Sequence, residues 1–339
     1  MQRLLSPLRL ATAGLALLVV VLVVLVTRTS SDYLQVPDEP HPLQTLVQVP
    51  DSKPDQNGGD VFYVDVLIKR ASLLESILPA VRPEGSDLID RDVLVQPGIS
   101  DSERFKLDLA VMKASQTVAS VVALRQLGYK VPIRPAGVRV VVVTSGSHAE
   151  RVLKEGDVIV RVDGKPVRTR DDLAAILAGH EPGDVVRVVL RRDSKLVRLS
   201  IRTTADRQDP KRAIIGFLPI QGLNVRFPFP IRFNLRKVGG PSAGLAFALE
   251  LLEKRGRNVD HGYNVAATGE IQLDGSVTRI GGIKQKTIGA RKSNVDVFLV
   301  PVDGDNAKEA KRYAKDLRII PVESFQQALR ALATLPEKS

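Results

Sequence analysis

Residues 239–244 read Gly-Gly-Pro-Ser-Ala-Gly, and residues 245–252 continue as Leu-Ala-Phe-Ala-Leu-Glu-Leu-Leu. Glycine and proline stop the preceding segment, so this stretch predicts a buried helix that begins at Ser242. Backbone N–H groups and the positive end of the helix dipole can stabilise negative charge on an oxygen at such a position. Ser242 is therefore a candidate nucleophile, although a serine here could also serve only as a helix N-cap. The residues that would support it are Gly240, Pro241 and Ala243.

A serine nucleophile needs a base. The Gly-x-Ser-x-Gly string fits a nucleophile elbow, which requires a later acid and then a histidine. His261 is the only histidine after the serine, and the carboxylate nearest to it in sequence is its neighbour Asp260. A lysine can serve instead if burial lowers its pKa. Lys284 and Lys286 are the candidates on the next predicted helix, and Lys286 is the better one because it shares a face with Ile283.

Three motifs in this order resemble the proteolytic domain of Lon proteases over roughly residues 214–335. They are residues 239–244, Ala-Ala-Thr-Gly-Glu-Ile at 266–271 and Gly-Gly-Ile-Lys-Gln-Lys at 281–286. In that family the serine of the first motif is the nucleophile and the second lysine of the third motif is its partner. The resemblance therefore implies a catalytic dyad of Ser242 and Lys286, with Thr268 orienting the lysine through its hydroxyl. Many Lon proteins have aspartate at the position of Gly239, so the role of that carboxylate is open in this chain.

Residues 131–205 contain short β-branched runs and turns, with Glu-Gly-Asp-Val-Ile-Val-Arg-Val-Asp-Gly-Lys-Pro-Val at 155–167. This order resembles the PDZ domains of bacterial envelope proteases, which bind an extended peptide between a sheet edge and a helix. The resemblance implies an edge at 137–142 and a helix at 171–178. The implied peptide-binding residues are Gly137, Val138, Val140, Leu173 and Ile176. A spacer that binds no peptide is the alternative.

The N-terminal part predicts a membrane anchor. Residues 10–27 carry no charge, and 18 helical residues span about 27 Å, close to the bilayer core of roughly 30 Å. Basic residues within 1–9 favour a cytoplasmic N-terminus and extracytoplasmic C-terminal domains at the cell membrane. A cleaved signal peptide is the alternative, but no small-x-small site follows the apolar run. The proline-containing residues 28–59 predict an extended linker, and residues 60–130 predict a further α/β segment.

Composition excludes several classes of protein. The 339 residues suffice for about two domains, and the absence of cysteine excludes disulfides and thiolate metal sites. The net charge of +11 is scattered, tryptophan is absent and aromatic residues make up 4%, which argues against nucleic-acid binding. No phosphate-binding loop occurs, so the sequence gives no basis for an ATP-driven motor. We expect neither a metal nor another cofactor.

Together these observations predict an α/β (α+β) chain with an N-terminal transmembrane helix, a PDZ-like β-rich domain and a Lon-type proteolytic domain. The expected function is a membrane-anchored serine endopeptidase that cuts unfolded or PDZ-captured polypeptides without its own ATPase. Because Lon-type domains assemble into rings, the resemblance also implies a homo-oligomer. The alternative is a non-catalytic scaffold that binds peptides in the PDZ groove.

Overall fold

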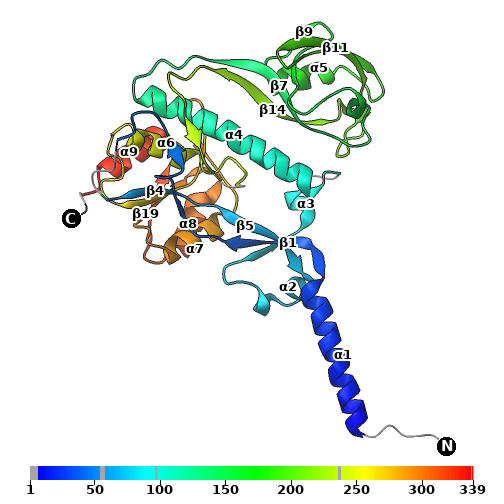
Figure 1. The fold of residues 1–339 in the computed structure, drawn as a ribbon, viewed down its shortest axis with the longest axis vertical. Coiled ribbons are helices and arrows are strands. Elements are labelled where there is room, and N and C mark those ends of the chain that lie inside the picture. Colours follow the sequence, from blue (N-terminus) through cyan, green and yellow to red (C-terminus); the bar gives the residue numbers. More distant parts are fainter. Residues whose placement is uncertain (1–6, 54–57, 96–97, 236–237, 337, 339) are drawn as a thin grey trace, which may run out of the picture.

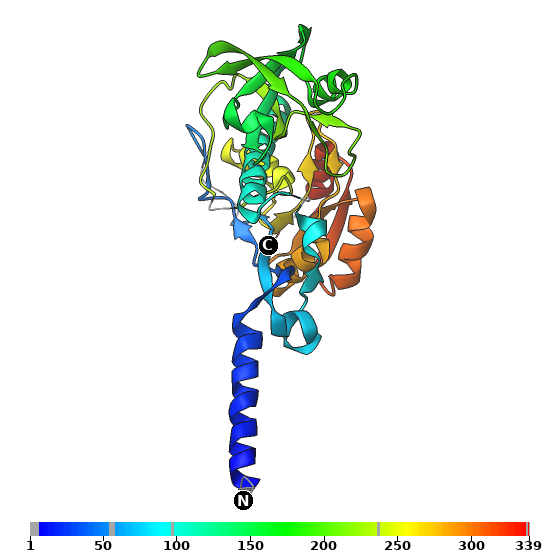
Figure 2. The ribbon, with the colours of Figure 1, turned by 90° about the vertical axis from the view of Figure 1, so that its right-hand side faces the viewer.

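The computed structural model describes residues 7–53, 58–95, 98–235, 238–336 and 338. A single helix, α1 (Pro7–Thr27), projects from the folded body in both views (Figures 1 and 2). This helix is long and apolar enough to cross a membrane, and its described side chains are not buried. Helix α4 (Asp101–Gln126) passes the same test of length and composition, but side chains between Met112 and Leu124 are buried inside the body. This part of α4 therefore belongs to the core.

The C-terminal part of the body is a three-layer α/β unit around a five-stranded sheet. The strand order is β2 (His41–Pro42), β4 (Asp60–Tyr63), β16 (Asn264–Ala267), β19 (Val297–Pro301) and β20 (Arg318–Val322), with all but β2 parallel. Helices α6 (Gly244–Lys254) and α9 (Phe325–Ala333) pack on one face of the sheet. Helices α7 (Ile283–Lys292) and α8 (Asn306–Tyr313) pack on the other face.

Alternating side chains separate the two cores of this unit. Val265 and Leu299 pack with α6 and α9, whereas Ala266 and Phe298 pack with α7 and α8. Burial on both faces is the usual environment of parallel strands and explains their nearly continuous apolar sequence.

The predicted linker over residues 28–59 is wrong. Strand β1 (Thr29–Pro37) pairs with β5 (Val66–Ser72) and with β6 (Asp87–Ile89). Tyr33 and Leu34 are buried, and so are Leu43 and Val47 farther along. The prolines did not prevent pairing because Pro37 ends its strand and Pro42 lies in the short edge strand β2.

The PDZ-like unit is a second sheet, inserted in the chain between α4 and α6 (Figure 1). Its strand order is β11 (Lys195–Arg202), β10 (Val185–Arg192), β8 (Val158–Val162), β7 (Ile133–Val143) and β14 (Phe217–Val225). Strand β14 thus lies after the predicted start of the proteolytic domain at 214 but belongs to the PDZ-like sheet. The expected segment 60–130 is likewise divided, because β4 joins the proteolytic sheet and α4 packs on α6.

Short elements complete the fold. The remaining helices are α2 (Leu73–Ile77), α3 (Arg91–Leu94) and α5 (Arg170–Leu177), with 3-10 turns η1 (Pro79–Val81), η2 (His148–Arg151) and η3 (Asp303–Asp305). The remaining strands are β3 (Val47–Gln48), β9 (Lys165–Pro166), β12 (Thr204–Ala205), β13 (Ala213–Ile214), β15 (Arg232–Phe233), β17 (Glu270–Ile271) and β18 (Val277–Thr278). Helix α5 agrees with the predicted range 171–178 to within one residue at each end.

Candidate active site

Ser242 lies in the loop that enters α6. The helix begins at Gly244 with Ala243 as its N-cap, two residues later than predicted. The helix is buried from Gly244 to Leu252, which agrees with its apolar sequence, whereas Ser242 itself is half-buried. The side chain therefore stands at the border of the core, close to the N-terminal end of a buried helix.

Helix α4 holds the serine loop from the other side. The Gly240 amide donates to the carbonyl oxygen of Asp108 at 2.9 Å, and the Ser115 hydroxyl donates to the carbonyl oxygen of Pro241 at 3.0 Å. A Cβ atom on Gly239 would lie 2.6 Å from the Cβ of Asp108. A side chain at 239, including an aspartate, would therefore collide with α4. Sequence reasoning missed this contact, because it assigned no role to the helix.

Lys286 reaches the serine from α7. Its Nζ atom lies 2.6 Å from Ser242 Oγ, and it donates to the carbonyl oxygen of Val64 at 2.9 Å and to Thr268 Oγ1 at 3.2 Å. Only 2% of Lys286 is exposed, and this burial lowers the pKa of its amine from 10.5 to about 8. About one tenth of the amine is therefore neutral at pH 7, and a general base acts in this form.

Thr268 connects the two side chains. It lies between β16 and β17, is fully buried, and donates from Oγ1 to the carbonyl oxygen of Ser242 at 3.1 Å. Thr268 Oγ1 also accepts the hydrogen bond from Lys286 Nζ. Three separate segments thus meet at one point, and the threonine fixes the amine relative to the serine backbone.

A carboxylate that sequence reasoning did not single out lies beside the lysine. Asp65 follows Val64, and its negative charge acts on Lys286 by raising the pKa that burial lowers. Burial raises the pKa of Asp65 itself, and His41 lies 3.4 Å from its Oδ1 atom. Among the described residues, Asp38, His41 and Asp65 form one group whose potential metal-ligating atoms lie within 4.8 Å of one another. All three residues are partly exposed, and His41 Nε2 lies 3.9 Å from a carboxylate oxygen of Asp38 and 3.4 Å from one of Asp65.

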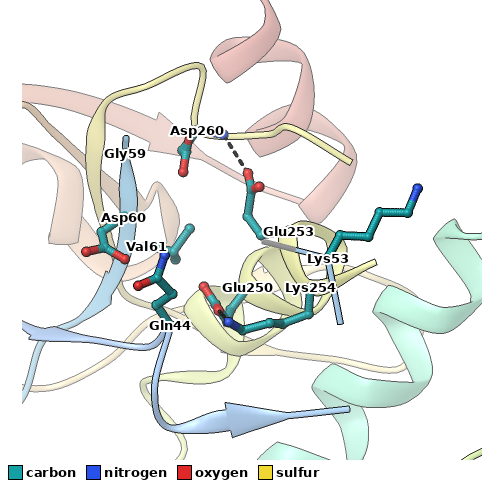
Figure 3. A pocket seen from close by; sticks show the side chains of 9 residues that line it. All are labelled: Gln44, Lys53, Gly59, Asp60, Val61, Glu250, Glu253, Lys254 and Asp260. Carbon is teal, nitrogen blue, oxygen red and sulfur yellow. Dashed lines mark hydrogen bonds and ion pairs between the residues drawn. The ribbon is translucent and has the colours of Figure 1, made fainter. Parts of the chain in front are cut away.

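The structure does not bring the rival bases to Ser242. Lys284 donates to Asp87 Oδ1 at 2.6 Å. His261 lies in a turn with φ of 51°, next to Asp260. Asp260 lines a hollow with Glu250 and Lys254 toward the C-terminal end of α6 (Figure 3), whereas Ser242 precedes the N-terminal end of this helix. Among the described residues that line this hollow there is no serine, threonine or histidine.

The expected peptide-binding edge is wrong. Strand β7 is internal, since Val138 pairs with Ile159 of β8 on one side and with Gln221 of β14 on the other. Within the described residues β14 ends the sheet, and it contacts α5. Gln221 accepts from the Arg170 amide at 3.3 Å and so ties β14 to the start of this helix.

The five residues implied for peptide binding lie in the core of the PDZ-like unit or at a close contact between its strands. Val138 and Val140 are fully buried, Leu173 is buried and Ile176 is partly buried, all in the core of the PDZ-like unit. A Cβ on Gly137 would lie 2.3 Å from the carbonyl oxygen of Ile159, so this glycine permits close strand contact. The free edge could not be located from the sequence because β14 lies more than 70 residues beyond β7.

Comparison with known proteins agrees with these two units. The family model of the Lon protease (S16) C-terminal proteolytic domain matches residues 236–334, and that of the PDZ domain matches residues 112–203. Residues 236–334 are thus similar in sequence to the proteolytic domain of Lon proteases. The predicted α/β architecture, with a PDZ domain before a serine-type peptidase domain, is thereby confirmed.

The similar relatives are Lon proteases, of which this chain matches a small part. The Lon protease of Mesomycoplasma hyopneumoniae is 40% identical over 91 residues, which are 26% of this chain and 10% of that protein. Lon protease 1 of Myxococcus xanthus is 38% identical over 100 residues, which are 28% of this chain and 12% of that protein. The PDZ domain of an SdrC-like protein from Listeria monocytogenes is 26% identical, with a TM-score of 0.23, over 25% of this chain and 87% of that structure.

Proposed function

We propose that this protein is a membrane-anchored serine endopeptidase whose catalytic groups are Ser242 and Lys286. The observation that carries the proposal is the 2.6 Å separation between Ser242 Oγ and the Nζ atom of a lysine that is almost completely buried. A serine hydroxyl is a weak nucleophile unless a neighbouring base removes its proton. A surface lysine would be an ammonium ion at neutral pH, and burial is what makes this one a base.

In the proposed mechanism neutral Lys286 takes the hydroxyl proton while Ser242 Oγ attacks the carbonyl carbon of a peptide bond. Hydrogen bonds already engage the amides of Gly240 and Gly244. The amides of Ser242 and Ala243 are therefore the donors that would hold the oxyanion. The lysine ammonium then protonates the leaving amine, and water releases the acyl enzyme with the lysine again acting as base.

Helix α1 would anchor the enzyme, and the PDZ domain would capture its substrates. Peptide strands add to exposed sheet edges in PDZ domains, so we assign the acceptor edge to β14, beside α5. Without a motor domain in this chain, unfolded polypeptides should be cut and folded proteins should resist. A homo-oligomeric ring and an extracytoplasmic active site complete the proposal.

The test is cleavage of an unfolded protein by the purified full chain in detergent, compared with Ser242→Ala and Lys286→Ala. We expect cleavage by the unchanged protein and essentially none by either variant. Equal cleavage by either variant would exclude the dyad. The competing function is a non-catalytic scaffold, and it predicts that the unchanged protein binds unfolded peptides without cutting them.

A further inference from the structure

Five consecutive apolar residues, Ile77-Leu78-Pro79-Ala80-Val81, are all exposed. Ile77 is 70% exposed, Leu78 44% and Val81 43%. They form the end of α2 and the turn η1, and α2 contributes no buried residue to the body. A contiguous exposed apolar patch usually marks an interaction site, whereas single exposed apolar residues are ordinary. Outside α1, the other large hydrophobic side chains that are exposed in the described residues are isolated in sequence: Leu67, Val93, Phe105, Val185, Leu196 and Val302.

This patch lies beside the point where α1 enters the body. The amide of Leu73, the first residue of α2, donates to the carbonyl oxygen of Arg28 at 2.8 Å. Thr29 pairs with Ser72, and α2 contacts α1. In both views the α2 segment is at the end of the body from which α1 projects (Figures 1 and 2). Arg28 is also the first charged residue after the apolar run 10–27.

We propose that residues 77–81 insert into the surface of the same bilayer that α1 spans, as a second, interfacial contact. The inference rests on the proposed membrane anchor. If α1 crosses the bilayer, its apolar run ends at Thr27, which places the neighbouring α2 and η1 at the level of the lipid headgroups. Interfacial segments bury their apolar face about 5–10 Å into the boundary between headgroups and acyl chains. The patch follows α2, which contacts the apolar helix α1, and it therefore fits this partner.

The backbone of the segment suits such an environment. Amides transferred out of water must find acceptors within the protein. The Leu78 amide donates to Leu74, the Val81 amide donates to Leu78, and Pro79 has no N–H group. Arg82 donates from its guanidinium to the carbonyl oxygens of Glu75 and Ser76, which satisfies the end of α2 and holds a cation next to the patch.

The absence of tryptophan in this chain provides a direct test. Single variants Ile77→Trp, Val81→Trp, Leu18→Trp and Val185→Trp are made in the full chain and reconstituted into phosphatidylcholine–phosphatidylglycerol vesicles. Some vesicles contain lipids brominated near the headgroup, and others contain lipids brominated deep in the acyl chain. Leu18 reports on α1, whereas exposed Val185 reports on the PDZ domain.

We expect the emission of the Leu18→Trp variant to be quenched by the deep bromines, and that of Ile77→Trp to be blue-shifted and quenched by the shallow ones. The position 185 reporter should not be quenched by either. Quenching at 18 with none at 77 or 81 would overturn the interfacial contact and leave the anchor intact. No quenching at 18 would overturn the anchor and this inference with it. A blue shift at 77 without bromine quenching would indicate protein packing on the patch and would also overturn it. Position 81 replaces 77 if Ile77→Trp does not fold.

Discussion

A buried titratable side chain lies near each end of helix α6: Lys286, from α7, near the N-terminal end and Glu250, from α6 itself, toward the C-terminal end. Only the N-terminal end has the geometry of an active site. At its N-terminal end, Lys286 lies 2.6 Å from Ser242 Oγ. At its C-terminal end, Glu250 lies 3.5 Å from Lys254 in the hollow of Figure 3. Burial lowers the pKa of Lys286 to about 8 and raises the pKa of Glu250 to about 8. A shifted pKa alone therefore does not identify a catalytic centre, because structural sites also produce one.

The largest expected effect is the loss of activity in Lys286→Met. This variant keeps a long buried side chain but removes the base, so we expect cleavage of an unfolded protein to fall by about 10³-fold or more. Stability should change in the opposite direction. The folded amine has a pKa below that of the unfolded chain, so burying it costs stability at pH 7, by about 3 kcal/mol. Removing the amine should therefore raise the free energy of unfolding by up to that amount.

Initial rates and denaturant unfolding of the same preparations measure both effects. Ser242→Ala is the matched control, since it should lose as much activity without a comparable gain in stability. Unchanged cleavage by Lys286→Met would mean that Lys286 is not the base, and the N-terminal end of α6 would then be no more an active site than the C-terminal end.

A smaller effect is expected for Thr268. Thr268→Val keeps the shape of the side chain but removes the hydroxyl that accepts from Lys286 and donates to the Ser242 carbonyl. We expect kcat to fall by about 10- to 100-fold with little change in KM, because the amine of Lys286 is no longer held in its orientation while its burial, and with it the lowered pKa, remains. Thr268→Ser retains the oxygen and should recover most of the activity. Full activity in Thr268→Val would assign the threonine a packing role only.

The sequence motifs predict which side chains meet at the candidate site better than they predict the surrounding elements. Ser242, Thr268 and Lys286 come from three short segments and contact one another in the structure. A local sequence can carry such motifs because each one shapes its own turn or helix. Their meeting point depends on β16 lying between the two helices, which no single motif specifies. The resemblance to a known family supplied that part.

Contacts between distant segments were the part that could not be predicted. The strands of residues 29–48 look like a linker because their partners, such as β5 and β15, lie far along the chain. The pairing of β14 with β7 and the support of the serine loop by Asp108 are of the same kind. Strand partners carry little sequence signal until one face is known to be buried.

The pH dependence of cleavage should follow the protonation of Lys286, and a change at the neighbouring Asp65 should move it. With a pKa of about 8 for Lys286, its neutral fraction rises from about one tenth at pH 7 to about nine tenths at pH 9. Activity should therefore rise roughly tenfold over this range and then level off. In Asp65→Asn the neighbouring negative charge is lost, the ammonium is stabilised less, and the rise should move to lower pH. An unchanged profile in Asp65→Asn would mean that this carboxylate does not act on the base.

The smallest effect on activity is expected for Glu250→Gln. Glu250 is 2% exposed, and its raised pKa means that the folded protein keeps it mostly protonated at pH 7 while the unfolded chain ionises it. The free energy of unfolding of the unchanged protein should therefore fall as the pH rises from about 5 to 8. Glutamine resembles the protonated acid in shape. The free energy of unfolding of the variant should therefore be close to that of the unchanged protein near pH 5 and exceed it by about 3 kcal/mol at pH 7. Denaturant midpoints across this range measure the difference, and cleavage at pH 8 should stay within about twofold of the unchanged rate. A large loss of cleavage would show that the two ends of α6 act together, because the helix that carries Glu250 also positions the Ser242 loop.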